Sequence, residues 1–163
     1  MRNLWIVHDD PMITWVAEGA HPDDFREAAQ RHDLNRMAFY DATGRIVEQE
    51  IDNLGALLRE LRPEDARHDD ILMKDRPPLE ISAGKDQVRF HVYSDIWFPH
   101  VTGVLDGFTD FPPTHDNPLA KYHTPRLNAF LEEAKAITKG AWYLDEEIYY
   151  IRKELVTDTR IIV

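Results

Sequence analysis

The sequence contains no cysteine, and this absence excludes disulfides, thiolate metal sites and a cysteine nucleophile. Serine is nearly absent too, because Ser82 and Ser94 are the only two and neither lies in a Gly-x-Ser-x-Gly nucleophile motif. Neither phosphate-binding glycine pattern, Gly-x-x-x-x-Gly-Lys or Gly-x-Gly-x-x-Gly, occurs in the chain. The sequence therefore predicts no nucleotide site and no resident cofactor, and it favours a binding protein over an enzyme.

Long hydrophobic runs are missing as well. The N-terminal apolar stretch, residues 4–7, is short and is soon followed by Asp9 and Asp10. A signal peptide needs an apolar core of about 7 to 15 residues, and a membrane helix needs about 20. We therefore expect no membrane partner and a cytoplasmic location, with which the lack of cysteine is compatible.

Basic residues are outnumbered, since 19 lysines and arginines stand against 30 aspartates and glutamates, a formal net charge of −11. The imbalance is concentrated in residues 1–70, which hold 16 acidic and 8 basic residues (net −8) and no lysine. Such a surface repels nucleic-acid phosphates, so we expect no nucleic-acid partner. It serves either solubility alone or the recognition of a basic protein, whose encounter complementary charge accelerates.

The composition is that of one globular domain. The 163 residues are 43% hydrophobic and 10% aromatic, which suffices for a hydrophobic core without cross-links. The chain shows no internal repeat and no linker-like boundary. Residues 1–163 are therefore predicted to form one domain.

Local patterns predict hairpins that alternate with helices. Alternating apolar residues and turn signals predict strand pairs at 4–7 and 12–17, at 37–41 and 45–50, and at 79–83 and 88–92. Helices are predicted from Pro22 to His32, from the Asp52 cap to Pro63, and from Thr124-Pro125 to Ile137. Residues 145–155 suit either a helix or a strand. We therefore predict an α+β fold, a single domain whose mainly antiparallel sheet is built from hairpins with about three helices packed on one face.

Residues 94–123 read as a long loop, rich in proline and aromatic residues. Loops of this length in small domains often carry function. Aromatic side chains mixed with aspartate and histidine suit a recognition surface, and they suit equally a loop that packs its own rings over the sheet. Both interpretations stay open for this segment.

Histidine precedes aspartate at several places in the chain, and imidazole with carboxylate is a common ligand set for zinc, iron or manganese. None of these steps has the i, i+4 spacing that places two ligands on one helical face. Residues 19–24 resemble, over those six positions only, the strand-end metal motif of zinc-dependent sugar N-deacetylases. That family continues with an acidic residue where this chain has Phe25, so we interpret the segment as a helix start.

The favoured function is an acidic cytoplasmic protein-binding domain, of the immunity or antitoxin kind, that masks a basic partner protein. The predicted contact residues combine the densest acidic cluster with the long loop: Glu64, Asp65, Asp69, Asp70, Asp95, Trp97, His100, Phe111, His115 and Asp116. One alternative is a small metal-dependent or acid/base hydrolase with its site in residues 94–123. A second alternative is a structural subunit of a larger assembly that docks through its loop aromatics.

Overall fold

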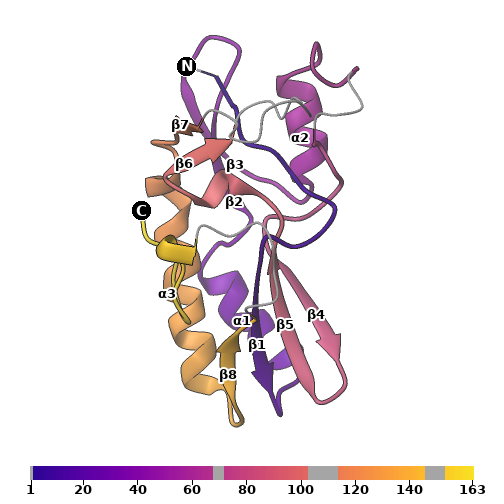
Figure 1. The fold of residues 1–163 in the computed structure, drawn as a ribbon, viewed down its shortest axis with the longest axis vertical. Coiled ribbons are helices and arrows are strands. Elements are labelled where there is room, and N and C mark those ends of the chain that lie inside the picture. The colour runs from indigo at the N-terminus through magenta and orange to yellow at the C-terminus, as the bar shows by residue number, and fades with distance from the viewer. Residues whose placement is uncertain (1, 68–71, 103–113, 146–152) are drawn as a thin grey trace.

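The computed structural model describes residues 2–67, 72–102, 114–145 and 153–163, and it confirms the predicted α+β fold (Figure 1). Its main sheet has four antiparallel strands, ordered β4-β5-β1-β8. Their bounds are Glu80–Gly84 for β4, Gln87–Val92 for β5, Ile13–Glu18 for β1 and Trp142–Leu144 for β8. The predicted 79–83 and 88–92 hairpin is therefore confirmed as β4–β5, and residues 12–17 are confirmed as a strand.

Helices α1 (Asp23–Arg31) and α3 (Ala120–Ile137) pack on each other and on one face of this sheet (Figure 1). The contact is aromatic. Phe90 of β5 meets Phe25 of α1 edge to face at 4.9 Å between ring centroids, and it meets Phe130 of α3 at 5.6 Å. Edge-to-face rings contribute beyond the area they bury. The predicted helix after Pro22 is confirmed, with Phe25 and Ala28 buried and Ala29 only partly buried.

Hairpin β2–β3 (Arg36–Tyr40 and Ile46–Glu50) is also confirmed. Gly44 adopts the positive φ of 81° that the turn requires, and Asp41 accepts hydrogen bonds from the backbone N–H groups of Thr43 and Arg45. Helix α2 (Leu54–Leu61) follows, at the end of the molecule away from the β4–β5 turn (Figure 1). Its cap is Asn53, whose side chain accepts from Ala56 N–H at 3.0 Å, and not Asp52 as predicted.

The predicted pairing of residues 4–7 with 12–17 is wrong. Both edges of β1 are taken, by β5 and by β8, so the N-terminal segment has no place beside it. Val7 instead bridges Met73 and Ser94, and its N–H donates to the Leu72 carbonyl at 2.9 Å. The segment consequently runs through the interior as a single strand-like connection between distant parts of the chain.

The described parts of the predicted 94–123 loop, residues 94–102 and 114–123, are more regular than predicted, and residues 103–113 lie outside the described residues. The described parts include the short 3₁₀ helix η1 (Asp95–Trp97), the pair β6 (His100–Thr102) and β7 (Thr114–Asp116), and the first turn of α3. Thr124 and Pro125 lie inside α3 and do not open it. On either side of this proline, the Thr124 hydroxyl donates to the Trp97 carbonyl of η1, and the Arg126 side chain donates to the Tyr122 carbonyl.

The C-terminal part of the chain includes the segment that suits either a helix or a strand. Ile137, predicted to be buried on α3, is 41% exposed, because the helix ends there beyond the sheet. Trp142–Leu144 forms the edge strand β8, and Lys153–Leu155 forms the 3₁₀ helix η2. The rest of the ambiguous 145–155 segment, residues 146–152, lies outside the described residues.

Gly55 generates a first prediction. A Cβ placed on it would lie 2.1 Å from the Lys74 carbonyl oxygen, because α2 packs directly on the backbone of the 73–76 segment. We expect Gly55→Ala to lower the free energy of unfolding by at least about 2 kcal/mol, measured by urea denaturation. Gly44→Ala meets no atom within 4 Å and should cost only about 1 kcal/mol, from its positive φ. Equal losses at the two sites would contradict the close packing of α2.

Candidate functional site

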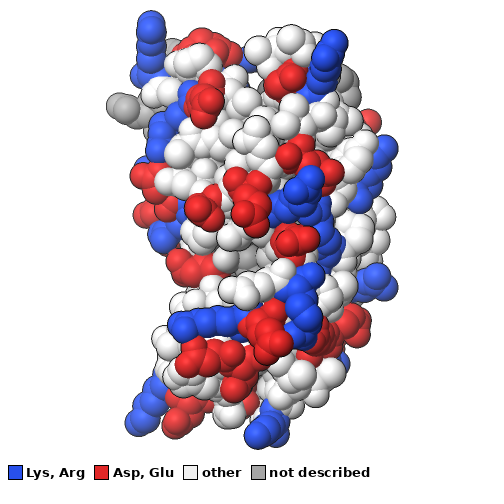
Figure 2. Space-filling view, turned by 180° about the vertical axis from the view of Figure 1, so that it is seen from behind, with Lys and Arg blue, Asp and Glu red and all other residues white. Residues whose placement is uncertain are grey.

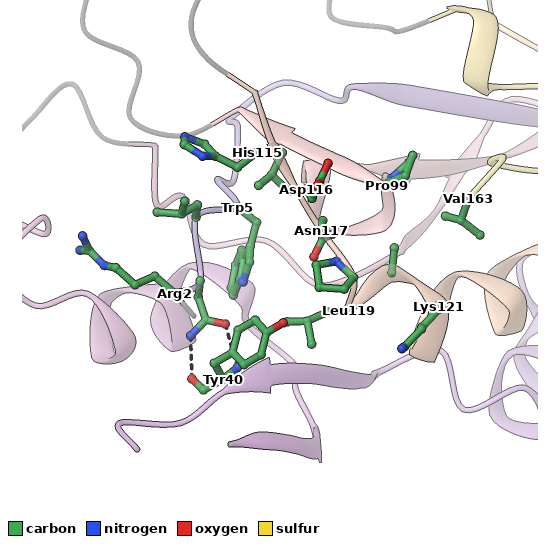
Figure 3. Close-up of a pocket in the computed structure, with 15 residues that line it drawn as sticks. Arg2, Trp5, Tyr40, Pro99, His115, Asp116, Asn117, Leu119, Lys121 and Val163 are labelled. Atoms are coloured by element: carbon green, nitrogen blue, oxygen red, sulfur yellow. Dashed lines mark hydrogen bonds between the residues drawn. The ribbon is translucent and has the colours of Figure 1, made fainter. Parts of the chain in front are cut away.

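A pocket of about 680 Å³ lies where the N-terminal segment, the end of β2, the β6–β7 hairpin and the start of α3 meet (Figure 3). Trp5 and Tyr40 line one side of it, and residues 115–121 line the other (Figure 3). Pro99 and Val163 complete the wall. Five stretches of the chain, residues 2–5, Tyr40, 99–101, 115–121 and Val163, therefore build one concave site.

Three of the predicted contact residues come together at this pocket. His100 and Asp116 are cross-strand partners on β6 and β7, and His100 Nδ1 lies 3.1 Å from Asp116 Oδ1. Both side chains are well exposed to solvent. His115 and Asp116 line the pocket directly (Figure 3). The hairpin thus presents an accessible imidazole–carboxylate pair at the rim.

Two other predicted contact residues lie in the interior. Asp95 is 4% exposed and its Oδ1 accepts from Ile6 N–H at 2.9 Å. Trp97 is fully buried and its indole donates to the Pro78 carbonyl at 3.2 Å. Neither side chain reaches the surface, so the structure assigns both to the core rather than to a contact face. Phe111, Asp69 and Asp70, the remaining members of the predicted set in these segments, lie outside the described residues.

The acidic pair Glu64 and Asp65 is neutralised within the molecule. Asp65 Oδ2 accepts from Nε of Arg62 at 2.8 Å, and Arg62 is 2% exposed. Glu64 Oε1 accepts from Nη2 of Arg2 at 3.1 Å at the surface. Local counting of acidic residues could not show this, because Arg2 is distant in sequence. Figure 2 shows the same mixing over one whole face, where red and blue side chains lie next to one another.

Carboxylates without a cationic partner gather elsewhere. Asp33 and Glu50 flank a groove of about 340 Å³ whose apolar lining includes Leu34, Leu79 and Ile81. Among the described residues, neither carboxylate forms an ion pair or a side-chain hydrogen bond. The sequence did not single them out, since they are 17 positions apart and no local pattern links them.

The sheet face opposite α1 and α3 carries a chain of polar contacts. The Thr14 hydroxyl lies 2.8 Å from His91 Nδ1, and the Ser82 hydroxyl lies 3.1 Å from His91 Nε2. Burial lowers the pKa of His91, which favours the neutral ring that these two contacts suit. The three residues tie β1, β5 and β4 together, and no sequence pattern signals them because each belongs to a different strand.

The side chains of His21 and Asp24 form hydrogen bonds with the backbone at the start of α1, in agreement with the interpretation of this segment as a helix start. Asp24 accepts from the His21 N–H at 3.0 Å, and His21 Nδ1 accepts from the Asp23 N–H at 3.2 Å. Within the described residues, no group of three or more histidine, aspartate and glutamate side chains is placed to hold a metal ion.

Comparison of the chain with protein-family models, with curated proteins and with solved structures finds no match. In the parts of the chain that the structure describes, no helix combines the length and the apolar character needed to cross a bilayer.

Asp65 generates a second prediction. Removing its carboxylate with Asp65→Ala leaves the buried Arg62 guanidinium without an anion, so unfolding should become easier by about 3 kcal/mol. Glu64→Ala breaks only an exposed pair and should cost less than about 1 kcal/mol. Urea denaturation of the two variants distinguishes a structural Asp65 from one reserved for a partner. A loss at Asp65 as small as that at Glu64 would overturn the structural role.

His123 generates a third prediction. It is 1% exposed, its ring lies edge to face against Trp97, and burial lowers its pKa to about 3. Because the pKa of His123 is lower in the folded state than in the unfolded state, the buried neutral ring lowers the stability of the fold only below about pH 6.5. As pH falls further, the unfolded state takes up a proton that the folded state does not, and the free energy of unfolding decreases. Between pH 7 and pH 4.5 this histidine alone should cost about 2 kcal/mol of stability. His123→Phe, which keeps an aromatic ring, should remove that part of the pH dependence in urea titrations. If the substitution left the pH dependence of stability unchanged, His123 would have to take up a proton in the folded state as readily as in the unfolded state, which would contradict the prediction.

Proposed function

We propose that this domain binds a basic partner protein, in the manner of an immunity protein or antitoxin that covers a toxic enzyme in the cytoplasm. The observation that supports this most directly is the pair of unpartnered carboxylates, Asp33 and Glu50, beside an apolar groove. Most other acidic side chains of the described residues already have an arginine, lysine or hydrogen-bond donor of their own. Asp10, Glu60, Asp86 and Glu154 also lack such a partner among the described residues, but Asp33 and Glu50 are the two that flank this apolar groove together.

The groove suits an arginine or lysine side chain. Its apolar wall, with Leu34, Leu79 and Ile81, can cover the hydrocarbon stem of such a residue while the charged head reaches the carboxylates. Hydrogen bonds between a guanidinium and carboxylates are among the strongest that proteins form. The combination selects a long basic side chain over a short or a neutral one.

The groove also lies beside unpaired strand edges. In the part of the chain that the structure describes, β4 is an outer strand of the four-stranded sheet and β3 pairs with β2 alone. Glu50 ends β3, and Ile81 lies in β4. A basic segment bound here in extended form could therefore add main-chain hydrogen bonds to the side-chain contacts.

The net charge of −11 supports the same partner class. Long-range attraction between an acidic and a basic protein raises the association rate, and it weakens as salt screens the charges. The proposed complex should accordingly form fastest at low ionic strength.

The fourth prediction tests the groove. The tagged chain would be purified gently from its own source cells at low salt and examined by native mass spectrometry, with a stoichiometric basic protein as the expected partner. Asp33→Asn/Glu50→Gln should weaken that complex by about 100-fold, since each lost charged hydrogen bond is worth about 1.5 kcal/mol or more. Asp33 has a positive φ of 48°, which asparagine tolerates, so the fold should survive.

The matched control is Glu60→Gln/Asp86→Asn. It removes the same two negative charges from exposed positions that have no ion pair among the described residues, so it reports the effect of net charge alone. This control should bind the partner nearly as tightly as the parent chain. Equal weakening in both double variants, or the absence of any stoichiometric basic partner, would contradict the proposal.

A further inference from the structure

We propose that the pocket between the N-terminal segment and α3 binds a small amphipathic carboxylic acid, with an aromatic or medium-length aliphatic body. This site is separate from the acidic groove and is lined by different residues. Its volume of about 680 Å³ lies in the range of small-molecule sites.

The tryptophans supply the first argument. Three of the four indole N–H groups donate to main-chain carbonyls: Trp15 to Thr157, Trp97 to Pro78 and Trp142 to Asp158. The fourth, Trp5, is 1% exposed and its Nε1 has no hydrogen-bond partner. Buried donors are almost always satisfied, and Trp5 is the tryptophan that lines the pocket (Figure 3). Protein atoms cover this nitrogen in the structure, so an acceptor atom of a bound molecule would reach it after a small shift of the neighbouring side chains.

Tyr40 supplies a second donor. The side chain of Asn3 forms two hydrogen bonds with the backbone of Tyr40. It donates to the Tyr40 carbonyl at 2.7 Å and accepts from the Tyr40 N–H at 2.9 Å. The Tyr40 hydroxyl, in contrast, has no hydrogen-bond partner among the residues the structure describes, although the residue is only 6% exposed. Burial raises the pKa of this phenol, so it stays protonated and able to donate. Two lining residues, Trp5 and Tyr40, thus each carry a donor that has no partner among the described residues.

The charges at the mouth favour an anion. Lys121 and Arg2 lie on opposite sides of the pocket (Figure 3). Lys121 forms no ion pair with a described residue, and its ammonium lies over the Tyr122 ring at 5.3 Å. Among the described residues that line the pocket, the one side-chain carboxylate belongs to Asp116, which is paired with His100. An incoming carboxylate would therefore meet one uncommitted cation and two uncommitted donors.

Most of the remaining wall is apolar and sets the shape of the ligand. Its apolar residues are Leu4, Pro99, Val101, Pro118, Leu119, Ala120 and Val163. The amide N–H groups of Asn3 and Asn117, which also line the pocket, donate to main-chain carbonyls. Such a surface favours a hydrocarbon body over a sugar or a phosphate ester, whose hydroxyl and phosphoryl oxygens would lose water without replacement. The ligand class is therefore an acid with one polar end and an apolar remainder.

The experiment uses ¹⁵N-labelled full-length chain and three naphthalene probes that differ only in charge: 2-naphthoate, 2-naphthamide and 2-naphthylmethylamine. In ¹H–¹⁵N spectra, 2-naphthoate should shift the Trp5 indole resonance downfield. That resonance is identified by its absence from the spectrum of Trp5→Phe. The naphthoate should bind more tightly than the amide, and the amine least tightly. Lys121→Met should weaken naphthoate binding by about fivefold and leave the amide unchanged, whereas Lys85→Met, a remote exposed lysine, should have no effect.

Because Trp5→Phe alters a buried ring, Tyr40→Phe provides a second test that removes only a hydroxyl and should weaken the naphthoate by several fold. Asp33→Asn/Glu50→Gln should leave probe binding unchanged, which keeps this proposal distinct from the proposed protein partner. No shift of the Trp5 indole with millimolar naphthoate would overturn the site. Tighter binding of the amine than of the acid would overturn the ligand class.

Discussion

The N-terminal segment, residues 3–8, imposes the constraint on which much of the structure depends. Its backbone is largely buried but belongs to no sheet, so its polar groups must find partners one by one. Ser94 donates to the Ile6 carbonyl, Asp95 accepts from the Ile6 N–H, and Arg62 donates to the Trp5 carbonyl. Each partner is buried, so each in turn requires its own support, as Arg62 does from Asp65. The pocket exists because this segment passes beside the start of α3 rather than along β1.

Elements with a strong local pattern could be predicted from the sequence. The leucine periodicity of 54–61 and the alternation around Gly44 and residues 84–86 specify a helix and two hairpins through neighbours a few positions away. The apolar residues 4–7 carry an equally good strand pattern, but their partners are Met73 and Ser94, which no local signal identifies. The start of α3 was misplaced for a related reason. Proline is typical of the first turn of a helix, so Pro125 predicts a start there, whereas α3 begins five residues earlier, at Ala120.

The candidate site was predictable in part. His115 and Asp116 were singled out by residue type, and they do line a pocket. The density of acids at 64–65 was misleading because charge neutralisation is a property of the folded molecule, in which Arg2 and Arg62 lie beside them. Asp33 and Glu50 lacked any pattern and became notable only as carboxylates that the fold leaves without cations. Both proposed binding sites are identified by charged groups and hydrogen-bond donors without partners among the described residues, rather than by dense clusters of acidic residues.

The contacts of β1 have a consequence for how the chain acquires its structure. Trp15 donates to the Thr157 carbonyl, 142 residues further along, and the outer neighbour of β1 comes from residues 142–144. Contacts of such long sequence separation slow folding, because a large loop must close before they form. During synthesis the first strand would leave the ribosome long before its partners, with its apolar faces uncovered. Chaperone dependence and aggregation of incomplete chains are therefore expected features of this protein in the cell.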